Sequence, residues 1–426
     1  MLKKVSKLNN SLIGTVAIPA DKSISHRAVM FCSLAKGKSI IKNFSCGADP
    51  KSSLEVFQNL GVQAEFTDNK TLTIKASGKF VAPANPLNCG NSGTTMRLIS
   101  GILASQDFNS TLIGDESLSR RPMKRIIEPL TLMGAELLSD NGHAPIKIIG
   151  KHLNAINYNS KLSSAQVKSC VLLAGLNAKG ITTFTEPVLS RNHSELLLKF
   201  MGADIQTCGN TVKIQQSQLE PKEIAVCGDI SSAAFFIAAA LIVPNSDITL
   251  KNIGLNPTRT GIIDVVKNMG GDIEILDIRE ISGELVGDVR VKYSELKGCT
   301  IEKEIIPRLI DEIPIIAVLA SVANGETIIR DAQDLRNKET DRISTVALEL
   351  GKLGTNITET NDGLIINGQK YLSGGVEVNS YKDHRLAMSF YIAGLICKNP
   401  INIKDFEWVN ISFPEFEHLI KSLTKL

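Results

Sequence analysis

The sequence has few aromatic residues and no long apolar run, and both shortages narrow what it can encode. Aromatic residues make up 5% of its 426 residues, and there is one tryptophan. Proteins that bind single-stranded nucleic acid usually stack bases on aromatic side chains, so this composition argues against RNA ends as a ligand. The longest apolar stretch, AAFFIAAALIVP at 233–244, is too short to cross a bilayer and predicts a buried helix.

Net charge and cysteine spacing argue against further classes of protein. The formal net charge is only +3, so no global field gathers nucleic acid and any basic site must be local. The eight cysteines include neither a CxxC pair nor a His/Cys cluster at zinc-ligand spacing. The amino-terminal residues, MLKKVSKLNNSLIG, lack the apolar core of a signal peptide. We expect a cytoplasmic protein with reduced thiols, no metal, no cofactor, no membrane contact and no nucleic-acid partner.

A helix end of the form apolar-Gly-small recurs along the chain and reveals an internal repeat. Each copy has an alanine-rich helix, a short strand, an amphipathic helix and a hairpin, and the sixth copy is truncated. The glycines that end the amphipathic helices are Gly61, Gly134, Gly202, Gly270 and Gly354.

The alanine-rich helices are apolar nearly all round, which predicts that they are buried with sheets outside them. Three repeats around a common helical core would make one domain, so six repeats predict two. The most even division lies near residue 227. We therefore expect an α/β protein with a first domain at 16–227 and a second at 1–15 and 228–426.

Polar residues cluster just ahead of the buried helices, as in LNCGNSGTTMRLISG at 87–101. Such a turn leaves backbone N–H groups at the positive end of a helix, where an anion binds well. A plain helix cap remains the alternative reading of this stretch. If the repeats are related by symmetry, all six helix starts could face one cleft between the domains.

Basic residues recur at these helix starts and in the neighbouring loops. A single one would be an ordinary surface charge, but a set at corresponding edges of a repeat suits a substrate pair rich in phosphate and carboxylate groups. The set is Lys22, Arg27, Arg121, Arg191, Lys338, Arg342 and Arg385.

Asp311 and Glu339 are the acidic candidates. Each has a structural reading, Asp311 as a helix cap and Glu339 as a first-turn partner of the helix dipole, and a functional one as a proton-transfer group. The histidines at the helix starts, His26, His193 and His384, are better read as hydrogen-bonding residues.

Six motifs in order, DKSISHRA, GNSGTTMR, RRPM, SSAQVKS, KETDR and KDHRLAM, resemble those of the 5-enolpyruvylshikimate-3-phosphate synthase family. The resemblance covers essentially the whole chain. It implies two inverse α/β barrels, each built from three βαβαββ repeats. It also implies transfer of the enolpyruvyl group of phosphoenolpyruvate to the 5-hydroxyl of shikimate 3-phosphate, on the route to chorismate and aromatic amino acids, without metal or organic cofactor.

The resemblance also implies roles for individual residues. Those expected to contact shikimate 3-phosphate are Lys22, Ser23, Arg27, Ser164, Gln166, Arg191, Asp311 and Lys338. Those expected to contact phosphoenolpyruvate are Lys22, Asn91, Gly93, Thr94, Arg121, Gln166, Arg342 and Arg385. The expected catalytic residues are Asp311 as the hydroxyl base, Glu339 as the acid at carbon and Lys22 as the group that steers charge.

The chain departs from the family pattern at Ala165, where part of the family has serine, at Asn337 and at Ile411, where many members have lysine. Because glycine is kept at Gly93, we expect inhibition by glyphosate, which competes with phosphoenolpyruvate in this family. A glycine needed only for its backbone angles is the alternative.

Two other functions stay open from the sequence. A sister enzyme with the same architecture transfers enolpyruvate to UDP-N-acetylglucosamine, but it typically has a cysteine before its Arg-Pro, and GDESLSRRPM has none. A noncatalytic module that binds phosphorylated metabolites or RNA ends would not need both Asp311 and Glu339. The expected partners are the two small substrates, and the expected state is a monomer.

Overall fold

The computed structural model describes residues 1–424 and divides the chain into two compact units. Unit 1 contains Met1–Pro19, Gly228–Arg279 and Leu285–Leu426, and unit 2 contains Ala20–Cys227 and Glu280–Glu284. Compared with the domains expected from the sequence, residues 16–19 lie in unit 1, because the strand that ends at Ala17 pairs there. Residues 280–284 lie in unit 2, although the neighbouring residues on both sides belong to unit 1.

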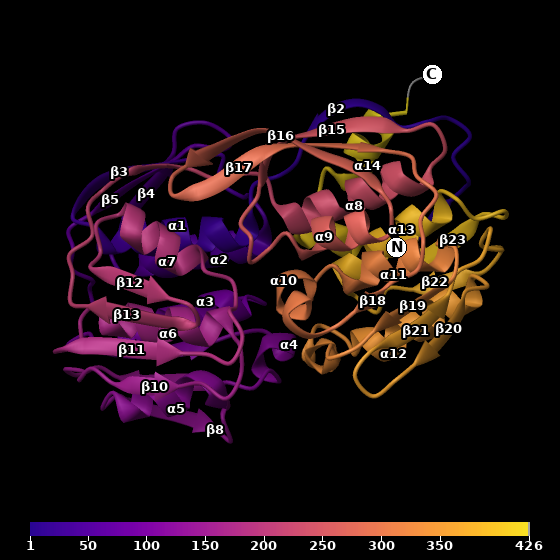
Figure 1. Cartoon of the computed structure of the whole chain (residues 1–426). Coiled ribbons are helices and arrows are strands. Elements are labelled where there is room, and N and C mark those ends of the chain that lie inside the picture. The colour runs from indigo at the N-terminus through magenta and orange to yellow at the C-terminus, as the bar shows by residue number, and fades with distance from the viewer. Residues whose placement is uncertain (425–426) are drawn as a thin grey trace. The chain divides into compact units, whose positions relative to one another are not determined.

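Three four-stranded sheets form the outside of unit 2 (Figure 1). In spatial order they are β14 (Glu223–Ala225), β3 (Gly37–Lys42), β5 (Leu72–Ala76), β4 (Gln63–Phe66); β6 (Leu87–Asn88), β7 (Asn109–Ile113), β9 (His143–Ile149), β8 (Glu136–Asp140); and β10 (Asn157–Asn159), β11 (Ile181–Thr185), β13 (Thr211–Gln215), β12 (Ile205–Cys208). Each sheet pairs its first two strands in parallel and ends in an antiparallel hairpin. This is the strand pattern of a βαβαββ repeat.

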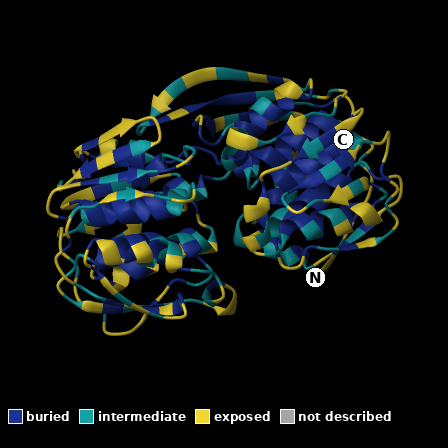
Figure 2. Ribbon diagram, turned by 60° about the horizontal axis from the view of Figure 1, so that its bottom comes forward, coloured by how far each residue is buried: buried dark blue, intermediate teal, exposed yellow. Residues whose placement is uncertain are grey.

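The helices of unit 2 follow the same repeat. The inner ones are α1 (Lys22–Leu34), α3 (Gly93–Leu103) and α6 (Ala165–Gly175), and the others are α2 (Ala48–Asn59), α4 (Glu116–Ser119), α5 (Lys124–Leu132) and α7 (His193–Phe200). Helix α3 packs against both α1 and α6. Most residues of the inner helices are buried, as the dark ribbons of Figure 2 show. The expectation of buried helices inside outer sheets is confirmed.

Unit 1 repeats the plan with two four-stranded sheets and one three-stranded sheet. They are β16 (Asp272–Ile281), β17 (Glu284–Lys292), β15 (Asp247–Gly254), β2 (Ile13–Ala17); β18 (Thr300–Ile301), β19 (Glu326–Ile329), β21 (Leu364–Asn367), β20 (Asn356–Glu359); and β1 (Leu2–Val5), β23 (Ile401–Lys404), β22 (Glu377–Asn379). The truncated sixth repeat lacks its hairpin, and β1 from the amino terminus completes its sheet instead.

The inner helices of unit 1, α8 (Ile230–Ile242), α11 (Ile313–Val322) and α13 (His384–Gly394), all contact one another. Helix α8 carries the longest apolar stretch, and its alanine-rich sequence favours a helix that can be buried on every face. The remaining helices are α9 (Gly261–Asn268), α10 (Ile306–Leu309), α12 (Arg342–Lys352) and α14 (Phe416–Ser422).

The first strands of two repeats are exchanged between the units. Strand β2 directly precedes α1 in sequence, yet it pairs in parallel with β15 of unit 1. Strand β14 directly precedes α8, yet it pairs in parallel with β3 of unit 2. Each unit is therefore completed by a strand that belongs, by sequence, to a repeat of the other.

The repeated glycines end their helices as predicted. All five have a positive φ, between 80° and 95°, in the left-handed region that L-residues with a side chain disfavour. At the first of them, the Gly61 N–H reaches the carbonyl of Gln58 while the Val62 N–H reaches that of Phe57. Among the described residues, every helix is too short or too polar to cross a membrane.

Candidate active site

Five of the six inner helices begin with a side chain that accepts a hydrogen bond from the backbone of their own first turn. The capping residues are Asp21, Ser92, Ser164, Asp229 and Asp383. The short polar motifs noted in the sequence therefore lie at helix amino termini, where the helix dipole favours negative charge. The caps satisfy only part of each first turn, so the remaining N–H groups stay available for an anion.

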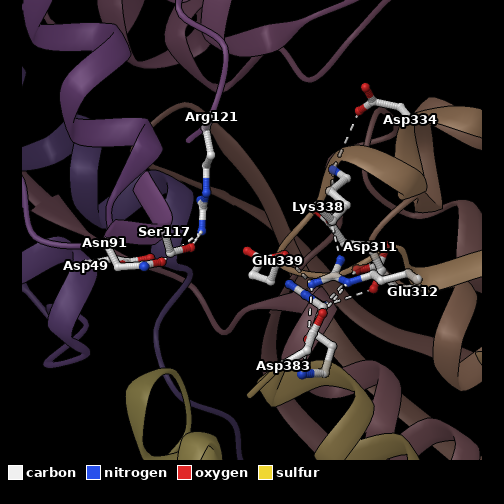
Figure 3. Close-up of polar contacts among 12 residues, drawn as sticks. Asp49, Asn91, Ser117, Arg121, Asp311, Glu312, Asp334, Lys338, Glu339 and Asp383 are labelled. Atoms are coloured by element: carbon white, nitrogen blue, oxygen red, sulfur yellow. Dashed lines mark hydrogen bonds and ion pairs between the residues drawn. The ribbon is translucent and has the colours of Figure 1, made fainter. Parts of the chain in front are cut away.

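The GNSGTT turn of unit 2 is tied to a neighbouring loop through Asn91. The Asn91 side chain donates from Nδ2 to Oδ2 of Asp115 over 2.7 Å and accepts at Oδ1 from Nη2 of Arg121 over 2.9 Å. Figure 3 shows the Arg121 guanidinium reaching Asn91 and Ser117, and the latter contact is 3.4 Å long. The arrangement holds a cation beside the amino terminus of α3.

Arg97 connects this turn to α6. It donates from Nη1 to Oε1 of Gln166 over 2.5 Å, and Gln166 donates from Nε2 to Oγ1 of Thr94 over 3.0 Å. A methyl group added at Gly93 would lie 3.2 Å from Nη1 of Arg97 and 3.6 Å from Nη1 of Arg121. We call Asn91, Gly93, Thr94, Arg97, Arg121 and Gln166 the loop cluster, and its chemistry suits a small, highly charged anion.

Helix α1 contributes a second set of groups in unit 2. Lys22, its first residue, forms an ion pair with Asp49. Arg27 is 3% exposed and donates from Nη1 to the carbonyl of Ser23 over 2.9 Å. Burial lowers the pKa of Arg27 to about 10, against the opposing effect of Glu195, so the guanidinium stays charged at neutral pH.

Two buried hydroxyl groups orient Arg27. Its Nε donates to Oγ of Ser194 over 2.7 Å, and its Nη2 donates to Oγ of Ser169 over 2.9 Å. The two hydroxyl oxygens are themselves 2.6 Å apart. Behind them, the fully buried Lys168 pairs with Glu195 at 2.8 Å and with Glu186 at 2.7 Å. The hydrogen bonds to Ser169 and Ser194 hold the Arg27 side chain in one orientation.

His26 is a buried hydrogen-bonding residue, in agreement with the reading of DKSISHR given above. It is fully buried, and its Nδ1 lies 2.7 Å from Oγ of Ser53, which in turn lies 2.8 Å from Oγ1 of Thr95. Burial lowers the pKa of His26 to about 3, so the ring is neutral. It joins α1, α2 and α3 as a structural hydrogen-bonding residue.

Unit 1 gathers its predicted residues around Arg342, whose side chain is 1% exposed. Arg342 donates from Nε to Asp383 over 2.8 Å, from Nη2 to Glu339 over 2.7 Å and from Nη1 to Asp311 over 3.4 Å. Although burial lowers it, the pKa of Arg342 is raised overall because Asp383, Glu339 and Asp311 favour the charged form. Figure 3 shows the side chains of Asp311, Glu339 and Asp383 gathered close together.

Lys338 and Arg385 flank the same group. Lys338 Nζ lies 3.3 Å from Oδ1 of Asp311 and 3.8 Å from Oδ2 of Asp334. Arg385 donates from Nη1 to the carbonyl of Asp311 over 3.3 Å and lies 3.7 Å from Oε1 of Glu312, a carboxylate with no exposed surface. We call Asp311, Glu312, Lys338, Glu339, Arg342, Asp383 and Arg385 the Arg342 cluster.

The simple structural readings of the two acidic candidates are wrong. Helix α11 is preceded by Glu312 at the cap position, so Asp311 lies one residue before the cap. Helix α12 begins at Arg342 with Asp341 as its cap, so Glu339 lies outside the first turn. Both carboxylates instead bind Arg342. Their positions are those of polar groups held for a purpose other than helix capping.

Contacts therefore join most predicted residues within each unit. The loop cluster joins Asn91, Thr94, Arg121 and Gln166, and the Arg342 cluster joins Asp311, Lys338, Glu339, Arg342 and Arg385. Ser164 caps α6 and Arg191 lies in the loop before α7, where its charge acts on Arg27. Ala165 begins α6, and Ile411 ends a 3-10 helix, Phe406–Ile411.

Sequence reasoning assigned no role to several residues of these clusters. Arg97 ends the quoted motif GNSGTTMR, Asp383 lies inside KDHRLAM, and Glu312 follows Asp311 directly. Their place within the motifs was the available signal. No sequence signal pointed to Asp49, which pairs with Lys22, because Asp49 lies outside the motifs. Within residues 1–424, no group of three or more His, Cys, Asp or Glu side chains is placed to hold a metal ion.

Comparison with known proteins gives a consistent result over the whole chain. A family model described as EPSP synthase (3-phosphoshikimate 1-carboxyvinyltransferase) matches residues 7–420. A relative of that name from Bacillus licheniformis is 50% identical over 98% of both chains, and another from Thermodesulfovibrio yellowstonii is 51% identical over 100% of both.

Solved structures agree with the sequence relatives. An EPSP synthase from Acinetobacter baumannii has a TM-score of 0.90 at 41% identity, covering 99% of this chain and 98% of its own. The enolpyruvyl transferase NikO from Streptomyces tendae has a TM-score of 0.81 at 18% identity, covering 99% of this chain and 97% of its own. At that identity the second likeness shows the fold alone.

Proposed function

The chain belongs to the EPSP synthase family, and from that premise we propose how its residues divide the family's reaction. The enolpyruvyl group of phosphoenolpyruvate is transferred to the 5-hydroxyl of shikimate 3-phosphate, which gives 5-enolpyruvylshikimate 3-phosphate and inorganic phosphate. This is the step of the shikimate pathway that leads toward chorismate and the aromatic amino acids. The transfer to UDP-N-acetylglucosamine is not favoured, because the family model and the relatives carry the 3-phosphoshikimate name.

One observation carries the assignment of the chemistry: two carboxylates, Asp311 and Glu339, both bind the buried guanidinium of Arg342. A module that only binds anions gains nothing from carboxylates beside its cations, since they repel the ligand. A transferase that must take one proton and give another has a use for both. A noncatalytic binding module therefore does not explain the presence of Asp311 and Glu339.

Shikimate 3-phosphate is assigned to groups of both units. In unit 2, Lys22, Ser23, Arg27 and the neighbouring Ser164, Gln166 and Arg191 provide donors for its ring substituents and phosphate. In unit 1, Lys338 and Asp311 are assigned to the ring side that carries the 5-hydroxyl. What supports this division is that Arg27 is rigidly held while Arg191 and Lys338 are only half-buried.

Phosphoenolpyruvate is assigned to the loop cluster and to the two arginines of unit 1. Asn91, Gly93 and Thr94 supply the helix amino terminus, and Arg121 and Gln166 supply donors for the phosphate. Arg342 and Arg385 are assigned to the carboxylate, where the planar guanidinium suits two-point binding. Lys22 is assigned to both substrates, where its charge balances theirs.

The proton path follows from these assignments. Glu339 in its acid form protonates the methylene carbon, while Asp311 takes the proton of the 5-hydroxyl as its oxygen attacks the adjacent carbon. The tetrahedral intermediate then expels phosphate, which leaves with the proton that Asp311 took from the 5-hydroxyl, and the methyl carbon returns a proton to Glu339.

A phosphate-release assay tests the function. Purified protein should release phosphate only when phosphoenolpyruvate and shikimate 3-phosphate are both present, and the rate should be the same in excess chelator. Product should be identified by mass spectrometry as the enol ether. Turnover with UDP-N-acetylglucosamine, or binding of both ligands without phosphate release, would overturn the proposal.

We further propose that the protein works in the cytoplasm as a monomer, with its two substrates as its only required partners and no nucleic acid. The low net charge and the scarcity of aromatic residues support this. Sedimentation at catalytic concentrations checks the oligomeric state, since a monomer should sediment near 46.1 kDa. A faster species that carries the activity would contradict the monomer.

A further inference from the structure

The hairpin formed by β16 and β17 has an unusual path. Its strands extend the sheet of unit 1 next to β15, yet its turn, Glu280–Glu284, belongs to unit 2. Figure 1 shows the two strands side by side as a long ribbon. The turn residues Ser282 and Gly283 both have positive φ, 53° and 82°, which is the backbone of a tight two-residue hairpin turn.

Three successive residues anchor this turn to unit 2. Ser282 accepts at Oγ from the N–H of Ala225 in β14 over 3.0 Å. Gly283 packs against α7 so closely that a methyl group there would lie 3.2 Å from the carbonyl oxygen of Leu196 and 3.3 Å from Cβ of Phe200. The anchoring is a close contact, because a side chain at position 283 would require its neighbours to move by a few tenths of an ångström.

Glu284 makes the third anchor through a buried contact with His193. Its Oε1 lies 2.6 Å from Nδ1 of His193, and the two residues are 4% and 2% exposed. Burying a carboxylate is costly unless it is paired and hydrogen-bonded, and packing alone would be served as well by an apolar residue. A carboxylate at this place therefore calls for an explanation beyond filling space.

What Glu284 holds is the first turn of α7, which carries binding groups of the shikimate side. His193 is the first residue of α7, and the next residue, Ser194, accepts from Nε of Arg27 over 2.7 Å. Arg191 stands two residues before His193. The charge of Glu284 also acts on buried Arg27 and favours its protonated form.

We infer that Glu284 is a positioning residue for shikimate 3-phosphate: through His193 it fixes the turn from which Ser194 orients Arg27 and from which Arg191 extends. The inference rests on the proposed function, because Arg27 and Arg191 are assigned to that substrate there. In this proposal, the hairpin of β16 and β17 affects the affinity for shikimate 3-phosphate but not the affinity for phosphoenolpyruvate.

The test compares three variants of the full chain with the wild type. Glu284→Ala removes the carboxylate that contacts His193 and should raise the KM for shikimate 3-phosphate by about tenfold or more, as expected for a lost hydrogen bond to a charged group. The KM for phosphoenolpyruvate, measured at saturating shikimate 3-phosphate, should change by less than about threefold. Glu284→Gln keeps an acceptor for the His193 Nδ1–H and should recover most of the affinity.

Glu280→Ala is the matched control, because Glu280 lies in the same turn segment with its side chain exposed. It should leave both KM values at the wild-type level. Calorimetric titration of each variant with shikimate 3-phosphate alone provides a second readout that does not depend on turnover. If Glu284→Ala does not fold, His193→Ala is measured in its place and should give the same substrate-specific loss.

Several results would overturn the inference. Equal rises in both KM values would mean that Glu284 supports the fold in general, and so would an equal effect of Glu280→Ala. An unchanged affinity in a folded Glu284→Ala protein would remove the role altogether. A Glu284→Gln variant as weak as Glu284→Ala would show that charge, and not orientation of His193, is what matters. Phosphate release by the wild type tests the proposed function separately from this inference.

Discussion

Arg97 and Gln166 face each other so that Nη1 of the arginine donates to Oε1 of the amide over 2.5 Å. A guanidinium only donates, so the amide oxygen must point toward Arg97 and the amide NH₂ must point the other way. The NH₂ group accordingly donates to Thr94 at the start of α3. Arg97 therefore orients the Gln166 amide so that its NH₂ group faces the loop cluster. An anionic substrate needs donors at that place.

Replacing Arg97 with Met should leave the Gln166 amide unable to hold one orientation. We expect the KM for phosphoenolpyruvate to rise by about tenfold, the usual effect of losing a charge-assisted hydrogen bond. Steady-state kinetics with each substrate in turn measures it. Arg120→Met removes the same charge from an exposed pair with Glu116 and should have little effect. An equal rise of this KM in both variants would mean that the overall positive charge matters, and not the orientation of the Gln166 amide.

Arg385→Ala should weaken phosphoenolpyruvate by about 1.5 to 3 kcal/mol, because it removes a charge-assisted contact assigned to the carboxylate. The variant also leaves Glu312 as a buried carboxylate without its cation, which destabilises the fold. The double variant Arg385→Ala/Glu312→Gln removes that second effect. It should recover thermal stability without recovering the KM for phosphoenolpyruvate. Recovery of both would show that Arg385 acts only through Glu312.

Asp311→Asn should lower kcat by about 10²- to 10⁴-fold, the range for loss of a general base, with small changes in either KM. Asparagine keeps an oxygen that can accept from Lys338 and Arg342, so the cluster stays in place. The control is Asp334→Asn, which changes the other, half-exposed carboxylate near Lys338. A comparable fall in kcat for the control would argue against a role of Asp311 in proton transfer.

Gly93→Ala should weaken glyphosate more than phosphoenolpyruvate. The alternative that Gly93 is needed for its backbone is contradicted, because it begins α3 and is not among the positive-φ glycines. An added methyl would instead press on the guanidinium of Arg97. Overfilling such a site costs about 1 to 3 kcal/mol, and the longer inhibitor has less room to shift. Inhibition constants decide, and parallel losses for both ligands would contradict the expectation.

His26 predicts a pH dependence of stability. Its pKa in the folded state is about 3 against 6.5 for the free side chain, so the unfolded chain binds the proton more readily. The contribution is present above pH 6.5 and is lost as the pH falls toward 3. Between pH 7.5 and 5 the free energy of unfolding should drop by about 2 kcal/mol from this residue.

Urea unfolding at the two pH values, followed by circular dichroism, measures this drop. His26→Asn keeps a polar group near the Nδ1 position but does not titrate, so its pH dependence should be smaller by that amount. His152→Asn changes an exposed histidine and should keep the wild-type dependence. Identical pH profiles for His26→Asn and the wild type would contradict the assignment.

Features set by local interactions could be predicted from the sequence, and features set by distant ones could not. The left-handed glycine after each amphipathic helix and the burial of Ile230–Ile242 follow from short segments, and both are found. The environment of Glu284 had no local signal, because EISGELVGD reads as an ordinary polar hairpin. Its burial depends on α7, which is remote in the sequence.

The same distinction applies within the candidate site. Helix caps such as Ser92 and Asp383 depend on the next few residues and could be recognised as polar starts. That Arg342 is enclosed by Asp383, Glu339 and Asp311 depends on three segments meeting in space. The sequence motifs identified the residue types, while their pairing required the fold.

The exchange of β2 and β14 sets an order for the folding of a chain that is made from its amino terminus. Residues 13–17 are synthesised first, but their partner β15 at Asp247–Gly254 is made only after nearly all of unit 2. Unit 2 receives its own exchanged strand as soon as Glu223–Ala225 leaves the ribosome. The amino-terminal segment is thus early in synthesis and late in folding, and its unpaired strand edge must stay soluble in the meantime.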